Sequence, residues 1–194
     1  RVAHLDDALV RCGLGDLRAL APLAALLLAA GAKPHVPTAR LAAVSVLLFD
    51  PQADKVVLVE QFRAGLVGRA ERPWCLETVS GFCDRADETD EALARREVRE
   101  ETGCELTALT RIGEFFVSPG FSVETITLFC GRVDARLAGG IHGLAAEGEE
   151  IRVVVLDRQA ALQALFGRIN STSALIALQW LDANRRRLLA DWDA

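Results

Sequence analysis

The order of apolar and charged segments predicts an α/β fold, in which a mixed β-sheet is covered by helices on both faces. Six short apolar segments rich in β-branched residues and bounded by turn residues are predicted strands: residues 41–49, 55–62, 74–79, 106–116, 123–132 and 151–156. Helices are expected in a charge-dense stretch that ends near Thr102, and at residues 159–166 and 173–189. One helix is predicted in the middle of the chain and two near its end, with strands between them. This order favours one sheet with a layer of helices on each face.

The first part of the chain has a different composition from the rest. Residues 5–32 are rich in Ala and Leu and are predicted to be helical, although glycines and a proline divide them. Residues 33–38 contain two prolines and are predicted to be a connector. We therefore expect an N-terminal helical segment, residues 1–38, which can supply packing or a dimer contact, and a main domain, residues 39–194.

Composition and charge exclude several classes of protein. The net charge of −5 leaves no basic stripe to neutralise a nucleic-acid backbone. The apolar run at residues 19–32 contains Pro22 and is too short to cross a bilayer, so no membrane association is expected. The five cysteines are odd in number, scattered and without a C-x-x-C pair, which is typical of buried thiols in a reducing cytoplasm.

The most informative stretch is residues 81–104, GFCDRADETDEALARREVREETGC. Glu97, Glu100 and Glu101 are three and four residues apart, so their carboxylates share one face of the predicted helix. Like charges on one face destabilise a helix unless something neutralises them. Mg²⁺ prefers oxygen ligands and is usually shared between a few carboxylates and substrate phosphates, so the pattern indicates phosphate chemistry. The alternative is a merely solvated acidic helix.

The same stretch resembles the Nudix box, the signature of hydrolases that cleave nucleoside diphosphates linked to another group. Gly81, Glu88 and the run REVREETGC at residues 96–104 carry the resemblance. The segment between Gly81 and Glu88 is one residue longer than the family pattern, and a loop tolerates such an insertion better than a helix does. The resemblance implies an α/β/α sandwich with a mixed sheet, in which the box forms a loop, a helix and a loop at one sheet edge.

Two later stretches resemble the ADP-ribose pyrophosphatase subgroup of this family. The first is the turn Ser118-Pro119-Gly120, and the second is the loop and strand at residues 140–152. Residues 176–181 also resemble the last helix of that subgroup, so the likeness extends over residues 43–192. It fails at residues 1–37, which lack the strand pattern of the subgroup's N-terminal sheet, so strand-exchanged dimerisation and the adenine contacts are open.

The resemblance implies a role for individual residues. Implied metal ligands are two box glutamates, a backbone carbonyl before the box glycine and a later loop glutamate: Glu97, Glu101, Ser80 and Glu149. The implied catalytic groups are Glu147 as the base, Arg96 as a brace for the carboxylates, and Glu100. The substrate-contacting positions are Arg63, Ser118 and Glu124. His142 is interpreted as structural, because a lone loop histidine usually is.

The predicted function is Mg²⁺-dependent hydrolysis of the pyrophosphate of ADP-ribose to AMP and ribose 5-phosphate, with Mn²⁺ able to substitute. The substrate is a small nucleotide sugar, and the enzyme is expected to be a cytoplasmic homodimer. Two alternatives stay open: hydrolysis of another nucleotide sugar such as GDP-mannose, and a non-catalytic ADP-ribose sensor. All three box glutamates are retained, which disfavours the sensor.

Overall fold

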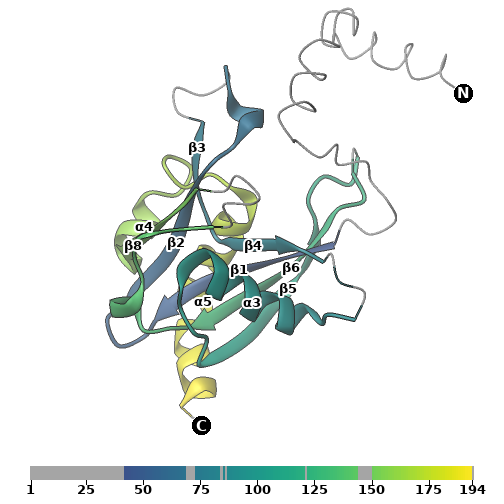
Figure 1. The fold of residues 1–194 in the computed structure, drawn as a ribbon. Helices are drawn as coiled ribbons and strands as arrows, with labels where there is room; N and C mark the ends of the chain where they lie inside the picture. Colours follow the sequence, from purple (N-terminus) through teal and green to yellow (C-terminus); the bar gives the residue numbers. More distant parts are fainter. Residues whose placement is uncertain are drawn as a thin grey trace, which may run out of the picture. The chain divides into compact units, whose positions relative to one another are not determined.

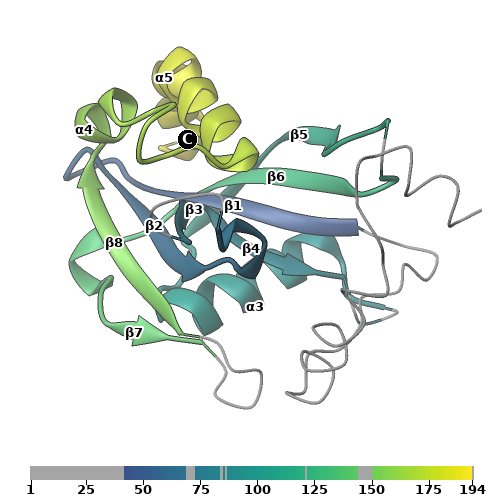
Figure 2. The ribbon, with the colours of Figure 1, turned by 90° about the horizontal axis from the view of Figure 1, so that it is seen from above.

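The computed structural model describes residues 42–68, 73–83, 85, 87–120, 122–143 and 150–193. Over these ranges it confirms the α/β fold: a mixed sheet lies between helix α3 on one face and helices α4 and α5 on the other (Figures 1 and 2). The predicted N-terminal segment, residues 1–38, lies outside the described residues, so its helical prediction stays a prediction. Among the described residues, no helix is long and apolar enough to cross a membrane.

The sheet has eight strands in the order β5-β6-β1-β2-β8-β7, with β3 beside β2 and β4 beside β1. Strand β1 runs parallel to β6, and the other pairs are antiparallel. The bounds of the strands are β1 Ala42–Asp50, β2 Lys55–Phe62, β3 Trp74–Glu77, β4 Val79–Phe82, β5 Ala108–Phe116, β6 Thr125–Arg132, β7 Ile141–His142 and β8 Ile151–Asp157.

The single strand predicted over residues 74–79 is in fact two strands. Strand β3 pairs with β2, and after Thr78 the chain crosses to pair with β1 as β4. The Thr78 hydroxyl is 2.6 Å from that of Ser45, and the Ser45 hydroxyl also donates to the Val79 carbonyl. These bonds satisfy buried polar groups at the crossing. As a result, β4 delivers Gly81 to a position opposite Val44.

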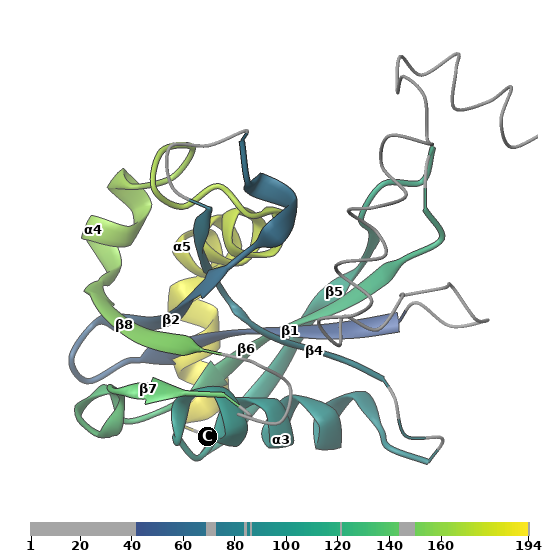
Figure 3. The same ribbon diagram turned by 45° about the horizontal axis from the view of Figure 1, so that its top comes forward.

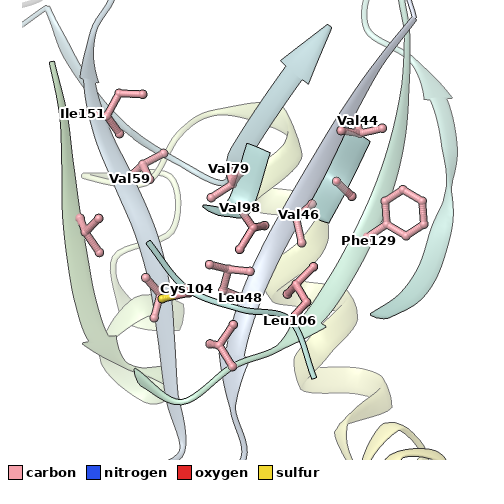
Figure 4. Close-up of a cluster of buried hydrophobic side chains, with 14 of the residues drawn as sticks. Val44, Val46, Leu48, Val59, Val79, Val98, Cys104, Leu106, Phe129 and Ile151 are labelled. Carbon is pink, nitrogen blue, oxygen red and sulfur yellow. The ribbon is translucent and has the colours of Figure 1, made fainter. Parts of the chain in front are cut away.

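Two apolar cores form because successive strand residues point to opposite faces. Val44, Val46 and Leu48 of β1 lie in one buried cluster with Leu93 and Val98 of α3. Figure 4 shows the three β1 side chains beside Val98. The intervening Leu47 and Phe49 point towards α5. The α5 residues that pack against them are all buried: Ala174, Ala177, Leu178, Leu181 and Leu188.

Helix α3, Asp90–Thr102, has both termini capped. The Thr89 hydroxyl accepts a hydrogen bond from the Ala92 amide at 3.2 Å, and two acidic residues occupy the first turn. Gly103 ends the helix with φ of 68°, a left-handed conformation that glycine adopts without strain. The helix is therefore fixed at both ends, which fixes its glutamates in space.

The last two helices differ in length from the prediction. Helix α4 covers Arg158–Gln163 and stops early, because the chain turns through Phe166, which has φ of 61°. Helix α5 covers Thr172–Trp192 and is longer than predicted, since Trp192 packs against Phe49 with ring centroids 6.4 Å apart. Strand β7 was not among the predicted strands: its residues Ile141 and His142 pair with β8.

Candidate functional site

The centre of the candidate site is the contact between strand β4 and helix α3. A Cβ atom on Gly81 would lie 2.2 Å from the carboxyl carbon of Glu97, far inside van der Waals contact. Only glycine therefore allows the Glu97 carboxylate to lie directly against the β4 backbone. Ser80 precedes this glycine on β4, so its peptide group adjoins the same carboxylate.

Arg96 holds three of the box carboxylates in one network. Its guanidinium donates twice to Glu88, at 3.0 Å each, and its NH1 group donates to Glu97 at 2.8 Å and to Glu100 at 3.1 Å. The bond to Glu88 is the main cause of a raised pKa of Arg96 and a lowered pKa of Glu88. The lengthened loop before Glu88 therefore leaves this glutamate in reach of Arg96, and the predicted bracing geometry is present.

Glu101 lies deeper than its neighbours. It is 5% exposed, and its carboxylate accepts a hydrogen bond from the Gln61 amide of β2 at 3.4 Å. Gln61 itself is 8% exposed. Sequence reasoning missed this glutamine, although its place two residues after the core residue Val59 puts it on the α3 face of the sheet.

Arg63 lies at the end of β2 and is oriented by a second residue that sequence reasoning missed. Its guanidinium donates to the Glu77 carboxylate of β3 through Nε at 2.8 Å and lies 2.6 Å from it through NH2. The Arg63 side chain is 42% exposed, whereas that of Glu77 is 17% exposed. Glu77 thus fixes one edge of the Arg63 guanidinium, and the Arg63 side chain still reaches solvent.

Ser118 and Glu124 lie in the connection between β5 and β6. The Ser118 carbonyl accepts from the Ser122 amide at 2.7 Å, and the Glu124 amide donates to the Ser122 hydroxyl at 3.0 Å. Thr125 is opposite Ala42, and Ala43 is opposite Phe82. The connection therefore lies at the same end of the sheet as β4, two strands away.

Two of the predicted functional residues, Glu147 and Glu149, lie outside the described residues. Their neighbour in sequence, Ile151, begins β8 and pairs with Gln61. Their predicted roles stay predictions.

The donor set on α3 fits a hard divalent cation. Glu97, Glu100 and Glu101 present only oxygen atoms as possible ligands from one helix. Within the parts of the chain that the structure describes, no group of three or more His, Cys, Asp or Glu side chains is gathered for metal binding. The α3 carboxylates would therefore supply part of a coordination shell.

Comparison with known proteins defines the class. A family model described as "NUDIX domain" matches residues 39–173, which include every described element of the site. The chain therefore belongs to the Nudix family, as its box predicts. Nudix hydrolases generally use a divalent metal ion, in agreement with the donor set on α3.

Individual relatives narrow the class further. The chain is 40% identical over 151 residues to the ADP-ribose pyrophosphatase of Escherichia coli K12, covering 77% of this chain and 72% of the relative. It is 40% identical over 171 residues to the ADP-ribose pyrophosphatase of Haemophilus influenzae, covering 84% and 78%. A GDP-mannose pyrophosphatase of Klebsiella pneumoniae is 34% identical over 143 residues, covering 72% and 70%.

Proposed function

We propose that this Nudix hydrolase cleaves the pyrophosphate of ADP-ribose with water, giving AMP and ribose 5-phosphate. The observation that carries the proposal is the Glu97 carboxylate seated on Gly81 and held by Arg96 beside Glu100. The choice of ADP-ribose rests on the two relatives named ADP-ribose pyrophosphatase, which match more of this chain and at higher identity than the relative named GDP-mannose pyrophosphatase.

Glu97, Glu101 and the Ser80 carbonyl are the proposed metal ligands, with Glu100 beside them. A bound Mg²⁺ ion, which Mn²⁺ could replace, would neutralise charge on the pyrophosphate and lower the pKa of an attacking water. Arg96 keeps Glu88, Glu97 and Glu100 together despite their mutual repulsion, because its guanidinium lies between them. Its proposed role is to hold the carboxylates in place before substrate arrives.

Glu147 is the proposed base, and Glu149 a further metal ligand. The register supports this assignment, since Ile151 pairs with Gln61, whose side chain donates to Glu101. Glu147 and Glu149 precede Ile151 by four and two residues in the sequence. The base would take a proton from the water that attacks phosphorus, and the bond to the bridging oxygen would then break.

Arg63, Ser118 and Glu124 are the proposed substrate contacts. Arg63 fits this role because Glu77 orients it while its guanidinium still reaches solvent. An arginine fork is well suited to a phosphate or a ribose hydroxyl.

The rest of the proposal concerns the whole protein. We infer that it is a cytoplasmic homodimer with one catalytic domain per chain, residues 39–194, and that residues 1–38 contribute to the dimer contact. The scattered cysteines support the location, because they suit a reducing compartment. Sedimentation of the full chain, compared with a variant that lacks residues 1–38, tests the dimer contact.

A panel of substrates tests the proposed activity. The purified protein should release AMP from ADP-ribose only with Mg²⁺ or Mn²⁺, with a higher kcat/KM than for GDP-mannose, NADH or diadenosine polyphosphates. A clear preference for GDP-mannose would replace the leading substrate by its alternative. Metal-independent binding of ADP-ribose without AMP release would favour the sensor.

Glu147→Gln should lower kcat by about a hundredfold or more, because the proposed general base is removed. Glu150→Gln is the matched control, since Glu150 is exposed and belongs to the same acidic stretch. Equal activity of the two variants would reject Glu147 as the base.

A further inference from the structure

The C-terminal end of helix α3 is in contact with the strand that carries His142. A Cβ atom on Gly103, the residue that ends α3, would lie 3.0 Å from Cε1 of the His142 ring. The ring is itself held, because its Nε2–H group donates to the Gly139 carbonyl at 2.8 Å. The edge of the His142 ring at Cε1 thus faces the end of the helix, and β7 lies beside α3 (Figure 3).

His142 also belongs to a row of residues that crosses three strands. It pairs with Ile151 of β8, which pairs with Gln61 of β2. Ile151 is 1% exposed and belongs to the core on the α3 face, so the three side chains of the row point to that face. At the far end of the row, Gln61 donates to Glu101, two residues before Gly103.

These contacts form a closed chain of residues that includes the last turn of α3. One path runs from Glu101 through Gln61, Ile151 and His142 to Gly103, and the helix backbone joins Gly103 to Glu101 again. The turn is therefore held at two points, by the Gln61 amide and by the His142 ring. If one point is removed, the turn can shift by a fraction of an ångström, which is enough to misplace a metal-binding carboxylate.

We infer that His142 is a positioning residue, which fixes the last turn of α3 and thereby the Glu101 carboxylate. The inference rests on the proposed role of Glu101 in metal binding. His142 contacts neither substrate nor metal in this scheme, and it acts through Gly103 and the strand row.

The test measures metal binding as well as turnover on the full chain. His142→Ala should weaken Mn²⁺ binding, followed by electron paramagnetic resonance of free Mn²⁺, by about tenfold, the usual loss when an outer partner of a ligand is removed. The kcat should fall by about the same factor, while KM at saturating metal stays within about twofold, since no substrate contact changes. His142→Gln keeps an amide donor for the Gly139 carbonyl and should recover part of the loss.

Ile141→Ala is the matched control, because Ile141 is 66% exposed and neighbours His142 on the same two-residue strand. A double-mutant cycle with Gly103→Ala isolates the contact. Ala at position 103, where φ is 68°, carries the same backbone strain with and without the ring, so this cost cancels in the cycle. Its methyl group displaces the His142 ring only when the ring is present, so the two losses in Mn²⁺ affinity should not add.

Unchanged Mn²⁺ affinity in a folded His142→Ala variant, or additive losses in the cycle, would overturn the inference. If the wild-type protein binds Mn²⁺ but does not hydrolyse ADP-ribose, the proposed substrate fails, while weaker Mn²⁺ binding by His142→Ala still supports the positioning role. The two claims therefore fail separately.

Discussion

Two arginine-centred ion networks lie on opposite faces of the sheet and differ in their balance of charge. Arg96, in the candidate site, meets Glu88, Glu97 and Glu100, and Arg85 joins it at Glu88 at 3.8 Å. Arg158, at the start of α4, meets Asp54 at 2.9 Å and Asp182 at 2.7 Å, and Arg185 joins it at Asp54. The first network has more carboxylates than cations, whereas the second is balanced.

This difference in charge balance suggests different roles: the Arg96 network is suited to metal binding, and the Arg158 network holds elements of the fold together. The second network joins the β1–β2 turn to α4 and α5, and every charge in it has a partner of the opposite sign. In the first network, the surplus negative charge destabilises the protein when no metal is bound, and it favours the binding of a divalent cation. Substitutions in the first network should therefore change activity, and substitutions in the second should change stability.

The largest effect is expected for Glu101→Gln, which removes a proposed metal ligand from the site. The kcat for ADP-ribose should fall by about 10²- to 10³-fold, because charge on the pyrophosphate is then poorly neutralised. Without metal, the free energy of unfolding should be unchanged or higher, since one buried negative charge is gone. Enzyme assays together with urea unfolding measure both quantities.

Glu91→Gln serves as the control for that experiment, because Glu91 is exposed in the first turn of the same helix. Near-normal turnover of Glu101→Gln would reject the assignment of Glu101 as a metal ligand.

A smaller loss of activity is expected for Gly81→Ala. The added methyl group would overlap the Glu97 carboxylate and push it off β4, so kcat should fall by about tenfold and the metal concentration for half-activity should rise. Gly113→Ala is the control, because a Cβ atom there would meet nothing within 4 Å. Equal activity of the two variants would show that the close contact between the Glu97 carboxylate and Gly81 is not needed for turnover.

The difference between the two networks also explains what the sequence predicted. The Arg96 network lies within one helix and the loop before it. Helical spacing brings Arg96 and Glu100 together, and Glu97 is the next residue in the chain. The Arg158 network joins residues far apart in the chain, and no local pattern indicates such contacts. Arg185, for example, bonds to Asp54 and lies 6.0 Å from the centre of the Phe49 ring, although both residues are far from it in the sequence.

The strands were predicted by their apolar runs, but the partners of those strands were not. The break at Thr78 arises because β3 and β4 pair with different strands. Tertiary contacts determine this pairing, and the local sequence does not. Gln61 and Glu77 were missed for the same reason, since each acquires its role only from a residue on another element. Their positions in strands could have marked them as polar residues facing the α3 core.

The smallest effect is expected for Asp54→Asn, which should change stability and leave kcat unchanged. Asn tolerates the left-handed backbone at this position, where φ is 51°, as Asp does. The hydrogen bond from Arg158 is the main cause of a lowered pKa of Asp54. Because the side chain is 40% exposed, solvent screens the pair, and the variant should lose only about 1 kcal/mol of unfolding free energy at pH 7.

The pH dependence fixes the cause of that loss. A carboxyl group whose pKa is lower in the folded state stabilises the protein above its unfolded pKa, and this contribution disappears as the pH falls through the folded pKa. The difference between wild type and Asp54→Asn should thus be full at pH 7 and shrink below the usual aspartate value of 3.8. Asp157→Asn, at an exposed pair with Lys55, should cost less at every pH. A difference that persists at low pH would mean that Asp54 does not stabilise the protein through its charge, and the second network would then not be an electrostatic clamp.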